Sequence, residues 1–347
     1  MTEGNRVQVN PNGIALSVVI STWNRRDLVW QAIDSVIGQQ YEGPLEIVVV
    51  DDGSTDGTIE ELSARYAART LPSNRRLIIH SNPHTGITGT MGKGIEISSG
   101  DSVAQCNSDD LWEPDRATDL LAEIEKTPNA LIQTTCKIRI LDGCQRPAFK
   151  ECDDYLAECG SIPFEYPGNV TLREALLGQL KPGLFFGGGL SVFPRRFLQG
   201  EFAMPAGLLH EEIWYTFAAI MQGGIRFANR NSYVWRIHEQ NNCLLEPRAE
   251  RELERTRCNL AFLEHAIPIL RNHMNQDDEL LKRVETRAHV VKYLLNVSTG
   301  SSLREALRGV SLSDLLSEPR NIFSSTLRVK MPSLSRFLRG AKLRSTG

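Results

Sequence analysis

The stretch EIVVVDDGSTDGT, residues 46–58, joins an apolar run to a dense group of acids, glycines and hydroxyl side chains. A continuous apolar run of this length is typical of a strand that is buried on both faces of a parallel sheet. The polar residues 54–56 are good helix caps, and the carboxylates of Glu60 and Glu61 favour the first turn of a helix. The stretch therefore predicts a buried strand, a polar turn and a helix, in that order.

The same alternation of strand and helix extends to both sides of this stretch. Upstream, residues 16–21 form another apolar run, and Asn24 is a candidate cap for a helix that continues to Ile37. Downstream, the pattern predicts strands at 77–80, 102–106 and 130–140, and a weak helix at 88–98. Strands that alternate with helices form right-handed βαβ units. The predicted fold class is therefore α/β, with a mostly parallel sheet flanked by helices.

The composition argues against several classes of protein. The 347 residues are 41% hydrophobic and 23% charged, which is typical of a soluble globular protein, and the net charge of −3 does not predict a nucleic-acid partner. No apolar run approaches the roughly 20 residues that a membrane span needs. The first residues, MTEGNRVQVNPNG, lack the apolar segment of a signal peptide. We therefore expect a protein that is made and kept in the cytoplasm.

The seven cysteines do not predict a zinc site or a disulfide framework. Their number is odd, and no pair is separated by only two residues, as zinc-binding pairs commonly are. Four of them fall between residues 136 and 159, at gaps wider than those of the usual zinc pairs. We expect reduced thiols, and the sequence leaves the role of this cluster open.

Helical patterns dominate the C-terminal part of the chain, over residues 246–317. After Glu318 the chain has seven basic residues and no acidic one, interleaved with apolar residues. Such a segment gains affinity for an anionic membrane from its charge and from its apolar side chains. Residues 319–347 are therefore a candidate for peripheral attachment to the cytoplasmic face of a membrane. A solvated tail is the alternative.

Polar side chains follow three of the predicted strands, at the point where each strand ends. They are residues 21–24, 51–52 and 107–110. Because ligands bind outside the carboxyl ends of parallel strands, these clusters converge on the edge where a ligand is expected. One acidic turn alone is most often a helix cap. The three together favour a site for a nucleotide and a metal ion.

Two common nucleotide motifs are missing from this sequence. The turn after the first strand, STWNRRD, has no GxGxxG, so a dinucleotide-binding fold has little support. Residues 86–94, GITGTMGKG, superficially resemble a phosphate-binding loop. That motif needs glycine and then serine or threonine where this chain has Ile87 and Gly94. Both motifs are therefore rejected.

Three segments, in this order and at this spacing, resemble the family 2 glycosyltransferases, which are inverting enzymes of GT-A fold. They are SVVISTWNRRDLVWQAIDSVIGQQ with the later EIVVVDDGSTDGT, then NSDDLWEPDR (107–116), then LLHEEIWYTFAAIMQGG (208–224). The resemblance implies a nucleotide-sugar-binding and catalytic domain of GT-A type over residues 14–242. Residues 243–318 carry no family motif and form the predicted helical C-terminal extension, and residues 319–347 form the basic tail.

The resemblance implies that the chain moves a sugar from a nucleotide diphosphate sugar, most often UDP-linked in this family, to a hydroxyl acceptor. Acceptors in the family include glycans, lipid-linked molecules and small molecules, and polysaccharide biosynthesis is a common role. The implied cofactor is Mg²⁺ or Mn²⁺, which bridges carboxylate and phosphate oxygens and neutralises the departing diphosphate.

The donor site follows from the matching positions. Ser21, Trp23 and Asp52 correspond to residues that hold the base, since an aromatic face stacks on a base and a carboxylate accepts the uracil N3–H. All positions assigned to the donor are Ser21, Trp23, Arg25, Asp52, Lys93, Asn107, Asp109 and Arg236.

The metal site is implied by the family's DxD motif, counted back from the proline that is Pro114 here. The motif then falls on 107–109, with Asn107 in place of the usual first aspartate and Asp109 as the metal ligand. Asp110 is expected either to cap the following helix or to orient the site from behind. The later VWRIHEQNNC (234–243) matches a common Arg-x-His, so Arg236 and His238 are expected to bind the diphosphate or complete the metal ligands.

The catalytic base is implied by an acidic pair ahead of a helix, which is Glu211-Glu212 here. Glu212 is the expected base, which removes the proton of the acceptor hydroxyl, and Glu211 is expected to support it. A simple preference of acids for a helix N-terminus is the alternative. Gly188 and Gly189 are expected to let the acceptor approach closely, unless they form only a tight turn.

Departures from the family pattern leave other functions open. Family members often carry an arginine where this chain has Met91, and Lys93 offers only a point charge as a substitute. A sugar nucleotidyltransferase is one alternative, but it would carry a glycine-rich loop after the first strand, where this chain has STWNRR. A binding protein on a degenerate transferase scaffold is the other, and Asn107, Met91 and Glu212 favour it. Sugar, nucleotide, acceptor and oligomeric state are not predicted.

Overall fold

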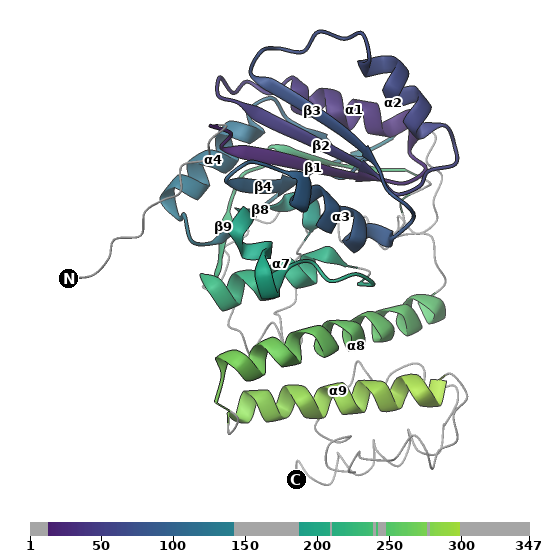
Figure 1. Ribbon diagram of the computed structural model, residues 1–347, viewed down its shortest axis with the longest axis vertical. Coiled ribbons are helices and arrows are strands. Elements are labelled where there is room, and N and C mark those ends of the chain that lie inside the picture. The colour runs from purple at the N-terminus through teal and green to yellow at the C-terminus, as the bar shows by residue number, and fades with distance from the viewer. Residues whose placement is uncertain are drawn as a thin grey trace, which may run out of the picture. The chain divides into compact units, whose positions relative to one another are not determined.

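The computed structural model (Figure 1) describes residues 13–141, 187–208, 210–238, 241, 248–275 and 278–298. The chain divides into two compact units, Met1–Asn241 and Asn242–Gly347, which we describe separately. Within these described ranges, none of the helices combines the length and apolar character needed to cross a membrane.

A seven-stranded sheet in the order β3-β2-β1-β4-β8-β6-β9 forms the centre of the first unit. Strands β3, β2, β1 and β4 run parallel to one another, as do β6 and β9, whereas β8 runs antiparallel to β4 and β6. The bounds are β1 Leu16–Thr22, β2 Leu45–Asp51, β3 Arg75–Ser81, β4 Ser102–Gln105, β6 Leu131–Thr134, β8 Ser191–Pro194 and β9 Ile225–Ala228. The expected α/β class with a mostly parallel sheet is confirmed.

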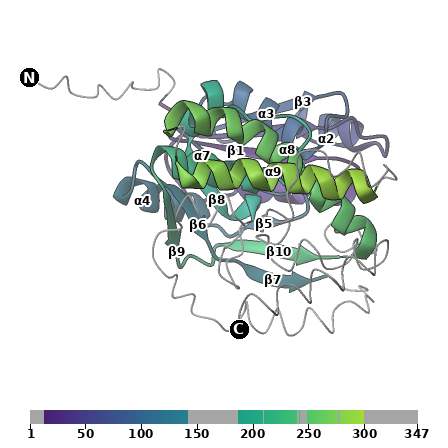
Figure 2. The same cartoon turned by 90° about the horizontal axis from the view of Figure 1, so that it is seen from below.

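A second sheet of three short strands lies beside the main one, and Figure 2 shows β10 and β7 running side by side. Its order is β5-β10-β7, with β10 antiparallel to β5 and parallel to β7. The bounds are β5 Leu111–Trp112, β7 Lys137–Ile140 and β10 Tyr233–Ile237. The single strand expected over residues 130–140 is therefore wrong, since β6 and β7 belong to different sheets.

Helices cover both faces of the main sheet (Figure 1). Apolar residues of α1, α2 and α4 pack in one core cluster with alternate residues of β1, and α3 packs against β1 and β2 from the other face, in contact with α7. The helices of this unit are α1 Arg26–Ile37, α2 Thr58–Tyr66, α3 Gly86–Ile97, α4 Arg116–Lys126 and α7 Glu211–Gln222, with short 3₁₀ turns η1 Gly188–Leu190, η2 Arg195–Leu198 and η3 Gly200–Phe202.

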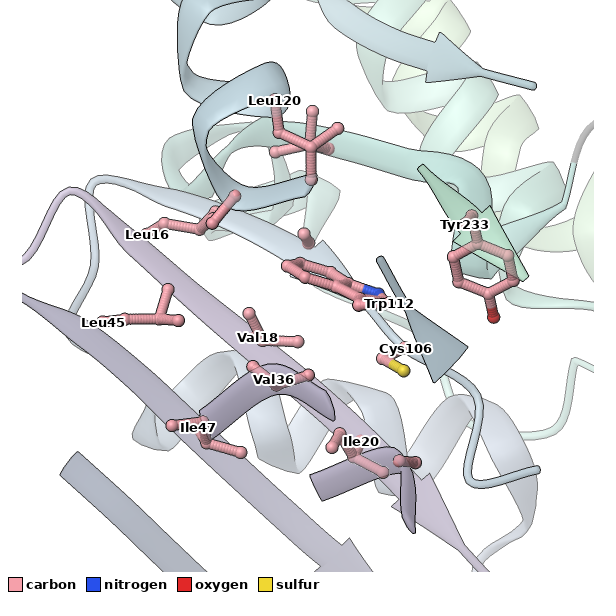
Figure 3. Packing of buried hydrophobic residues seen from close by; sticks show 14 of the residues in the cluster. Leu16, Val18, Ile20, Val36, Leu45, Ile47, Cys106, Trp112, Leu120 and Tyr233 are labelled. Atoms are coloured by element: carbon pink, nitrogen blue, oxygen red, sulfur yellow. The ribbon is translucent and has the colours of Figure 1, made fainter. Parts of the chain in front are cut away.

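The core shows why the first strand is a continuous apolar run. Leu16, Val18 and Ile20 lie on the face that carries Trp112 and Leu120, as Figure 3 shows. On the other face Val19 packs against Gly94 of α3, and every residue of β1 is buried, so both faces of the strand are removed from water. Each fully buried aliphatic side chain of this size stabilises the fold by about 1.5–3 kcal/mol. The sheet is therefore a rigid base for the loops at its carboxyl end.

Asn24 does not cap α1, although the sequence predicted that it would. The helix begins at Arg26, and Asn24 adopts a left-handed backbone conformation with φ of 51°. Its side-chain Oδ1 instead accepts a hydrogen bond of 2.8 Å from the backbone N–H of Thr55, and its own N–H donates to Ser54 Oγ at 2.8 Å. Asn24 therefore joins the turn after β1 to the turn after β2.

The second unit is helical where the structure describes it, as expected for the C-terminal extension. Helix α8 spans Arg248–His273 and contacts α9, which spans Glu279–Ser298. Arg271 forms an ion pair of 2.8 Å with Glu285 across the two helices. The basic tail 319–347 and the helical pattern expected after Ser298 lie outside the described residues. So do most of the cysteines between 136 and 159, while Cys106, Cys136 and Cys258 are free thiols.

Gly94 tests the contact between α3 and β1. Alanine favours a helix over glycine by about 1 kcal/mol, so helix propensity alone predicts that Gly94→Ala stabilises the protein. A Cβ at this position would overlap Cγ1 of Val19, and overpacking of a core costs about 1–3 kcal/mol. We expect Gly94→Ala to lower the free energy of unfolding measured by chemical denaturation.

The control is Lys93→Ala, one residue earlier on the same helix, where the side chain is partly exposed. We expect it to change the free energy of unfolding by less than about 0.5 kcal/mol. A stabilised Gly94→Ala variant would contradict the packing of α3 on β1.

Candidate active site

Three loops meet at the carboxyl ends of β1, β2 and β4, which are neighbours in the sheet. The loops are residues 23–25, 52–57 and 107–110. Arg236 in β10 and His238 just after it contact the third loop. Glu211, at the beginning of α7, contacts Gln105 of β4. The convergence predicted from the three polar clusters is therefore present. The side chains fall into three groups: an aromatic pair with Asp52, the acidic turn 107–110, and the pair Glu211 and Glu212.

The first aspartate of the DDGS sequence has a structural role. Asp51 accepts hydrogen bonds from Ser54, at 3.0 Å from the backbone N–H and 2.5 Å from the hydroxyl. The same hydroxyl receives the N–H of Asn24. These bonds close the turn after β2 and fix its position against the turn after β1.

The second aspartate, Asp52, is buried and binds the N-terminus of α3. Its carboxylate accepts the backbone N–H groups of Thr85 at 2.7 Å and Gly86 at 3.0 Å, and it lies 2.9 Å from Nδ1 of His84. A carboxylate has about four lone-pair sites, and these protein groups use most of them. The sequence predicted that Asp52 holds the base, whereas in the structure its bonds go to the loop before α3.

Trp23 and His84 form an aromatic pair beside Asp52. Trp23 is 45% exposed, which is unusual for so large an apolar side chain. The ring centroids of Trp23 and His84 are 5.1 Å apart at a tilt of 34°. Sequence reasoning found Trp23 and missed His84. The available signal was its position shortly after the strand at 75–81, which ends at the same edge of the sheet.

Asp109 and His238, predicted as metal ligands, lie together. Oδ2 of Asp109 is 3.2 Å from Nε2 of His238 and 3.7 Å from Nε of Arg25, and all three side chains are largely buried. Burial alone would raise the pKa of Asp109, but the hydrogen bond from His238 and the charge of Arg25 outweigh it and lower that pKa. Asp109 is therefore held as a carboxylate that faces a histidine and a cation.

Asp110 is fully buried and accepts three hydrogen bonds. The donors are the hydroxyl of Tyr233 at 2.6 Å, the backbone N–H of Arg236 at 2.8 Å and the side-chain amide of Asn107 at 2.8 Å. Burial first, and then the charge of Asp109, raises the pKa of Asp110 to about 8. Since α4 begins after Asp115, Asp110 is not its cap. It orients the turn from behind, which was the other expectation.

Arg236 is engaged by the protein itself. Its guanidinium donates to the backbone carbonyl of Asp109, to the side-chain oxygen of Gln31 at 2.6 Å and to the carbonyl of Leu28 at 3.4 Å. The side chain is nearly inaccessible to solvent. The sequence predicted that Arg236 binds the diphosphate, but the structure uses it to fasten the acidic turn to α1.

Three other predicted donor positions differ in what they offer. Ser21 is buried in β1 opposite Val50 of β2. Lys93 lies in the second half of α3 and pairs with Glu96 at 3.1 Å, so it does not join the loops of the site. Met91, which replaces the family's arginine, is completely buried in the core. Lys93 therefore does not take over the role of that arginine in this structure.

Glu211 and Glu212 open helix α7. Glu211 is buried and accepts a hydrogen bond of 2.6 Å from the side-chain amide of Gln105 at the end of β4. Glu212 is 23% exposed and lies 3.5 Å from Nδ1 of His210. Burial first, and then the charge of Glu211, raises the pKa of Glu212 to about 8. A carboxylate with a raised pKa at a partly open position has the properties of a general base.

The two glycines expected to admit an acceptor are packed against protein groups. A Cβ on Gly188 would overlap the side chains of Glu211 and Gln105, and a Cβ on Gly189 would overlap the ring of Tyr233. Both glycines are buried. Glycine is therefore required at 188 and 189 by close approach of the site's own side chains, which differs from the predicted role.

The match of this chain to known proteins agrees with its geometry. The sequence model described as "Glycosyl transferase family 2" matches residues 17–177. This segment therefore resembles the family that the sequence motifs predicted. The succinoglycan biosynthesis protein ExoO of Rhizobium meliloti is 27% identical over 228 residues, which cover 65% of this chain and 61% of that protein. The putative colanic acid biosynthesis glycosyl transferase WcaA of Escherichia coli is 32% identical over 111 residues, 32% of this chain and 38% of that one.

The expected GT-A fold is also found in a solved structure. TarS 1–349 of S. aureus, in complex with UDP-GlcNAc, superposes with a TM-score of 0.55 and covers 95% of this chain and 89% of that one, at 15% identity. At this identity the likeness shows the fold alone. The chain spans at most 61% of the length of the two curated relatives named above.

The side chains that this site offers to a divalent cation are an oxygen of Asp109 and a nitrogen of His238. In the part of the chain that the structure describes, no three His, Cys, Asp or Glu side chains are grouped for metal binding. Divalent cations at phosphate sites often take one or two protein ligands and complete their shell with phosphate oxygens and water. The donor set at this edge fits a Mg²⁺ or Mn²⁺ ion that is bound together with a diphosphate.

The raised pKa of Glu212 predicts a pH-dependent stability. A carboxyl group whose pKa rises from 4.5 in the unfolded chain to about 8 in the folded protein holds its proton only when folded across that window. Stability is therefore lost as pH rises from about 4.5 to 8. Glu212→Gln keeps a neutral side chain throughout. We expect its free energy of unfolding, relative to wild type, to increase by about 1–3 kcal/mol between pH 5 and pH 8.

Chemical denaturation at several pH values measures this difference. Glu125→Gln is the control, since Glu125 is an exposed carboxylate on α4. If both variants follow the wild-type pH dependence, Glu212 does not have a raised pKa.

Proposed function

We propose that this chain is a metal-dependent, inverting glycosyltransferase that moves a sugar from a nucleotide diphosphate sugar, UDP-linked in the first instance, to a hydroxyl acceptor. The observation that carries the proposal is the meeting, at one sheet edge, of an exposed aromatic pair, a carboxylate beside a histidine, and a glutamate with a raised pKa. We assign the aromatic pair to the nucleobase, the carboxylate and histidine to the diphosphate, and the glutamate to the acceptor hydroxyl.

The nucleobase is assigned to the face of Trp23. A half-exposed indole loses apolar contact with water when a base stacks on it, and such stacking contributes about 1–3 kcal/mol per base. His84 lies against Trp23 and is fixed by Asp52, so the indole is held for stacking before the base arrives. Asp52 therefore supports the base site chiefly through His84 and the loop before α3.

The diphosphate is assigned to the group formed by Asp109, His238 and Arg25. When a Mg²⁺ or Mn²⁺ ion is bound, Asp109 and His238 hold it and it supplies positive charge for the diphosphate leaving group. Arg25 already faces Asp109 and provides a second cation at the same place. Asn107, which donates to Asp110, leaves this side of the site with one less charge than a DxD aspartate would give.

The proton of the acceptor hydroxyl is assigned to Glu212. Inversion is a direct displacement at the anomeric carbon, in which the acceptor oxygen attacks as its proton leaves and the diphosphate departs from the opposite side. Glu212 is the partly exposed member of the glutamate pair, and its raised pKa makes it a stronger base than an ordinary carboxylate. Glu211 is buried and bound to Gln105, so we assign it a supporting role.

The acceptor class is proposed from the relatives. ExoO and WcaA are named for the biosynthesis of succinoglycan and colanic acid, so we propose a glycan or a lipid-linked glycan as acceptor and polysaccharide biosynthesis as the role. Cytoplasmic location and membrane attachment through residues 319–347 stay proposals from sequence, because these residues lie outside the described part of the chain.

A screen of nucleotide sugars by thermal shift, with and without Mn²⁺, tests the donor. A ligand that binds only the folded state raises the apparent melting temperature. Release of free nucleotide from the nucleotide sugar that stabilises the protein then distinguishes a transferase from a binding protein. The identity of the released nucleotide distinguishes a transferase from a sugar nucleotidyltransferase. A protein that no nucleotide sugar stabilises in the presence of Mn²⁺ would contradict the proposal.

Asp109→Asn tests the metal site. The variant keeps the shape of the side chain and removes the charge that a dication needs. We expect the enhancement of UDP affinity by Mn²⁺ to fall by at least about tenfold, while UDP binding without metal changes little. Isothermal titration with and without Mn²⁺ measures both values.

The control for this titration is Asp115→Asn, an exposed carboxylate at the beginning of α4, which should keep the full enhancement. An undiminished effect of Mn²⁺ in Asp109→Asn would show that the metal ligand has been misplaced.

Glu212→Gln tests the base. Removal of a general base lowers turnover by about 10²–10⁴-fold, while the affinity for the donor should stay the same because the glutamate faces the acceptor. Glu211→Gln is the matched variant, one residue away and buried, and we expect a much smaller loss. Initial rates and donor titrations of the two variants are compared, and equal losses of turnover would place the base elsewhere.

A further inference from the structure

A buried glutamine connects the acidic turn to the glutamate pair. Gln105 is the last residue of β4, which lies between β1 and β8 in the main sheet, and its side chain is completely buried. An amide in such a place costs free energy unless its polar atoms are hydrogen-bonded. The contacts of this side chain are therefore informative about what the site requires.

All the polar atoms of the Gln105 side chain are used. Its amide nitrogen donates to Oε1 of Glu211 at 2.6 Å and to Oδ1 of Asn107 at 3.1 Å. Its oxygen accepts the hydroxyl of Tyr215 at 3.1 Å. An ionised carboxylate only accepts hydrogen bonds, so these partners set the orientation of the amide. Gln105 thus joins the loop after β4 to the first turns of α7.

The backbone at Gly188 packs closely against the contact between Gln105 and Glu211. A Cβ on Gly188 would overlap both side chains, so η1 packs directly against their hydrogen bond. In the described part of the chain, no cation forms an ion pair with Glu211. The hydrogen bond from Gln105 is therefore the largest interaction that favours a charge on Glu211, with a smaller contribution from a backbone hydrogen bond.

We propose that Gln105 is a positioning residue for the glutamate pair: by donating to Glu211 it keeps the negative charge on the buried member, so that Glu212 is the member that takes up and releases the proton. This inference rests on the proposed function. Two carboxylates that are adjacent at the beginning of one helix and both withdrawn from water do not easily carry two charges. A hydrogen bond to one of them decides which one ionises first.

The raised pKa values of the pair agree with this arrangement. Burial raises the pKa of Glu211, and the bond from Gln105 opposes that rise. Burial and the charge of Glu211 raise the pKa of Glu212 to about 8. The other titratable groups that face the pair are His210, just before α7, and Tyr215, in its next turn. Neither donates to Glu211 in place of Gln105 in the contacts described.

Gln105→Met tests the proposal because it keeps the length of the side chain and removes the donor. Without that bond the pKa of Glu211 should rise, so Glu211 stays neutral while Glu212 titrates. We expect the pKa of Glu212 to fall by about one unit. The measurement is carbon-13 NMR titration of the full chain with labelled glutamate carboxyls, in which Glu212→Gln assigns the signal.

Gln133→Met is the matched control. Gln133 is also a completely buried glutamine in a strand of the same sheet, and it accepts a hydrogen bond from Ser191 instead of contacting a carboxylate. We expect it to lose stability as Gln105→Met does and to leave the pKa of Glu212 unchanged. An equal shift in both variants would reduce Gln105 to a structural role and overturn the proposal.

Tyr215→Phe provides a second variant if Gln105→Met does not fold. It removes the hydroxyl that orients the Gln105 amide and keeps the ring, so a smaller fall in the pKa of Glu212 is expected. In an active enzyme, the acidic limb of kcat/KM against pH should move by the same amount as the NMR value.

The NMR titration needs no substrate, so the two ideas fail separately. A shifted pKa in a protein that binds no nucleotide sugar would contradict the proposed function and support the role of Gln105. An active transferase in which Gln105→Met leaves the pKa of Glu212 within about 0.3 units of wild type would overturn the inference alone.

Discussion

The buried carboxylate of Asp110 joins the parts of the site that come from distant regions of the sequence. Its donors belong to the loop after β4 and to β10, which are more than a hundred residues apart in the chain. An unpaired carboxylate at this depth would be costly, so the fold must supply hydrogen bonds from these segments together. The neighbouring Asp109 is then turned toward Arg25 and His238, and the two acids serve different purposes.

The same need to hydrogen-bond buried polar groups explains the contacts of the other side chains at this sheet edge. Asp51 closes one turn, Asp52 caps α3 and fixes His84, and Gln105 ties the central strand to α7. Each of these groups is held by hydrogen bonds, so the exposed Trp23 and the partly exposed Glu212 are presented by a rigid support. This arrangement favours binding and proton transfer without reorganisation of the site.

Sequence reasoning succeeded where the signal is local. The apolar runs predicted strands at 16–21 and 46–50, and the structure has them at Leu16–Thr22 and Leu45–Asp51, because burial of both faces demands continuous hydrophobicity. The alternation of strands and helices predicted that the polar clusters meet at one edge. Sequence reasoning failed where a polar side chain can form hydrogen bonds with several different segments of the chain. Asn24 bonds to Thr55 instead of capping α1, and Arg236 bonds to carbonyls and an amide instead of remaining open.

The sequence by itself determined the α/β class, the resemblance to the family 2 glycosyltransferases and the identity of the residues at the sheet edge, since these depend on hydrophobic periodicity and on motifs read along the chain. The tertiary structure decided which of those residues are available. The space beside Gly188 and Gly189 is filled by the side chains of Glu211, Gln105 and Tyr233. Lys93 pairs with Glu96 on α3, away from the loops. Burial and hydrogen bonding between segments far apart in the chain set these outcomes, and no local pattern encodes them.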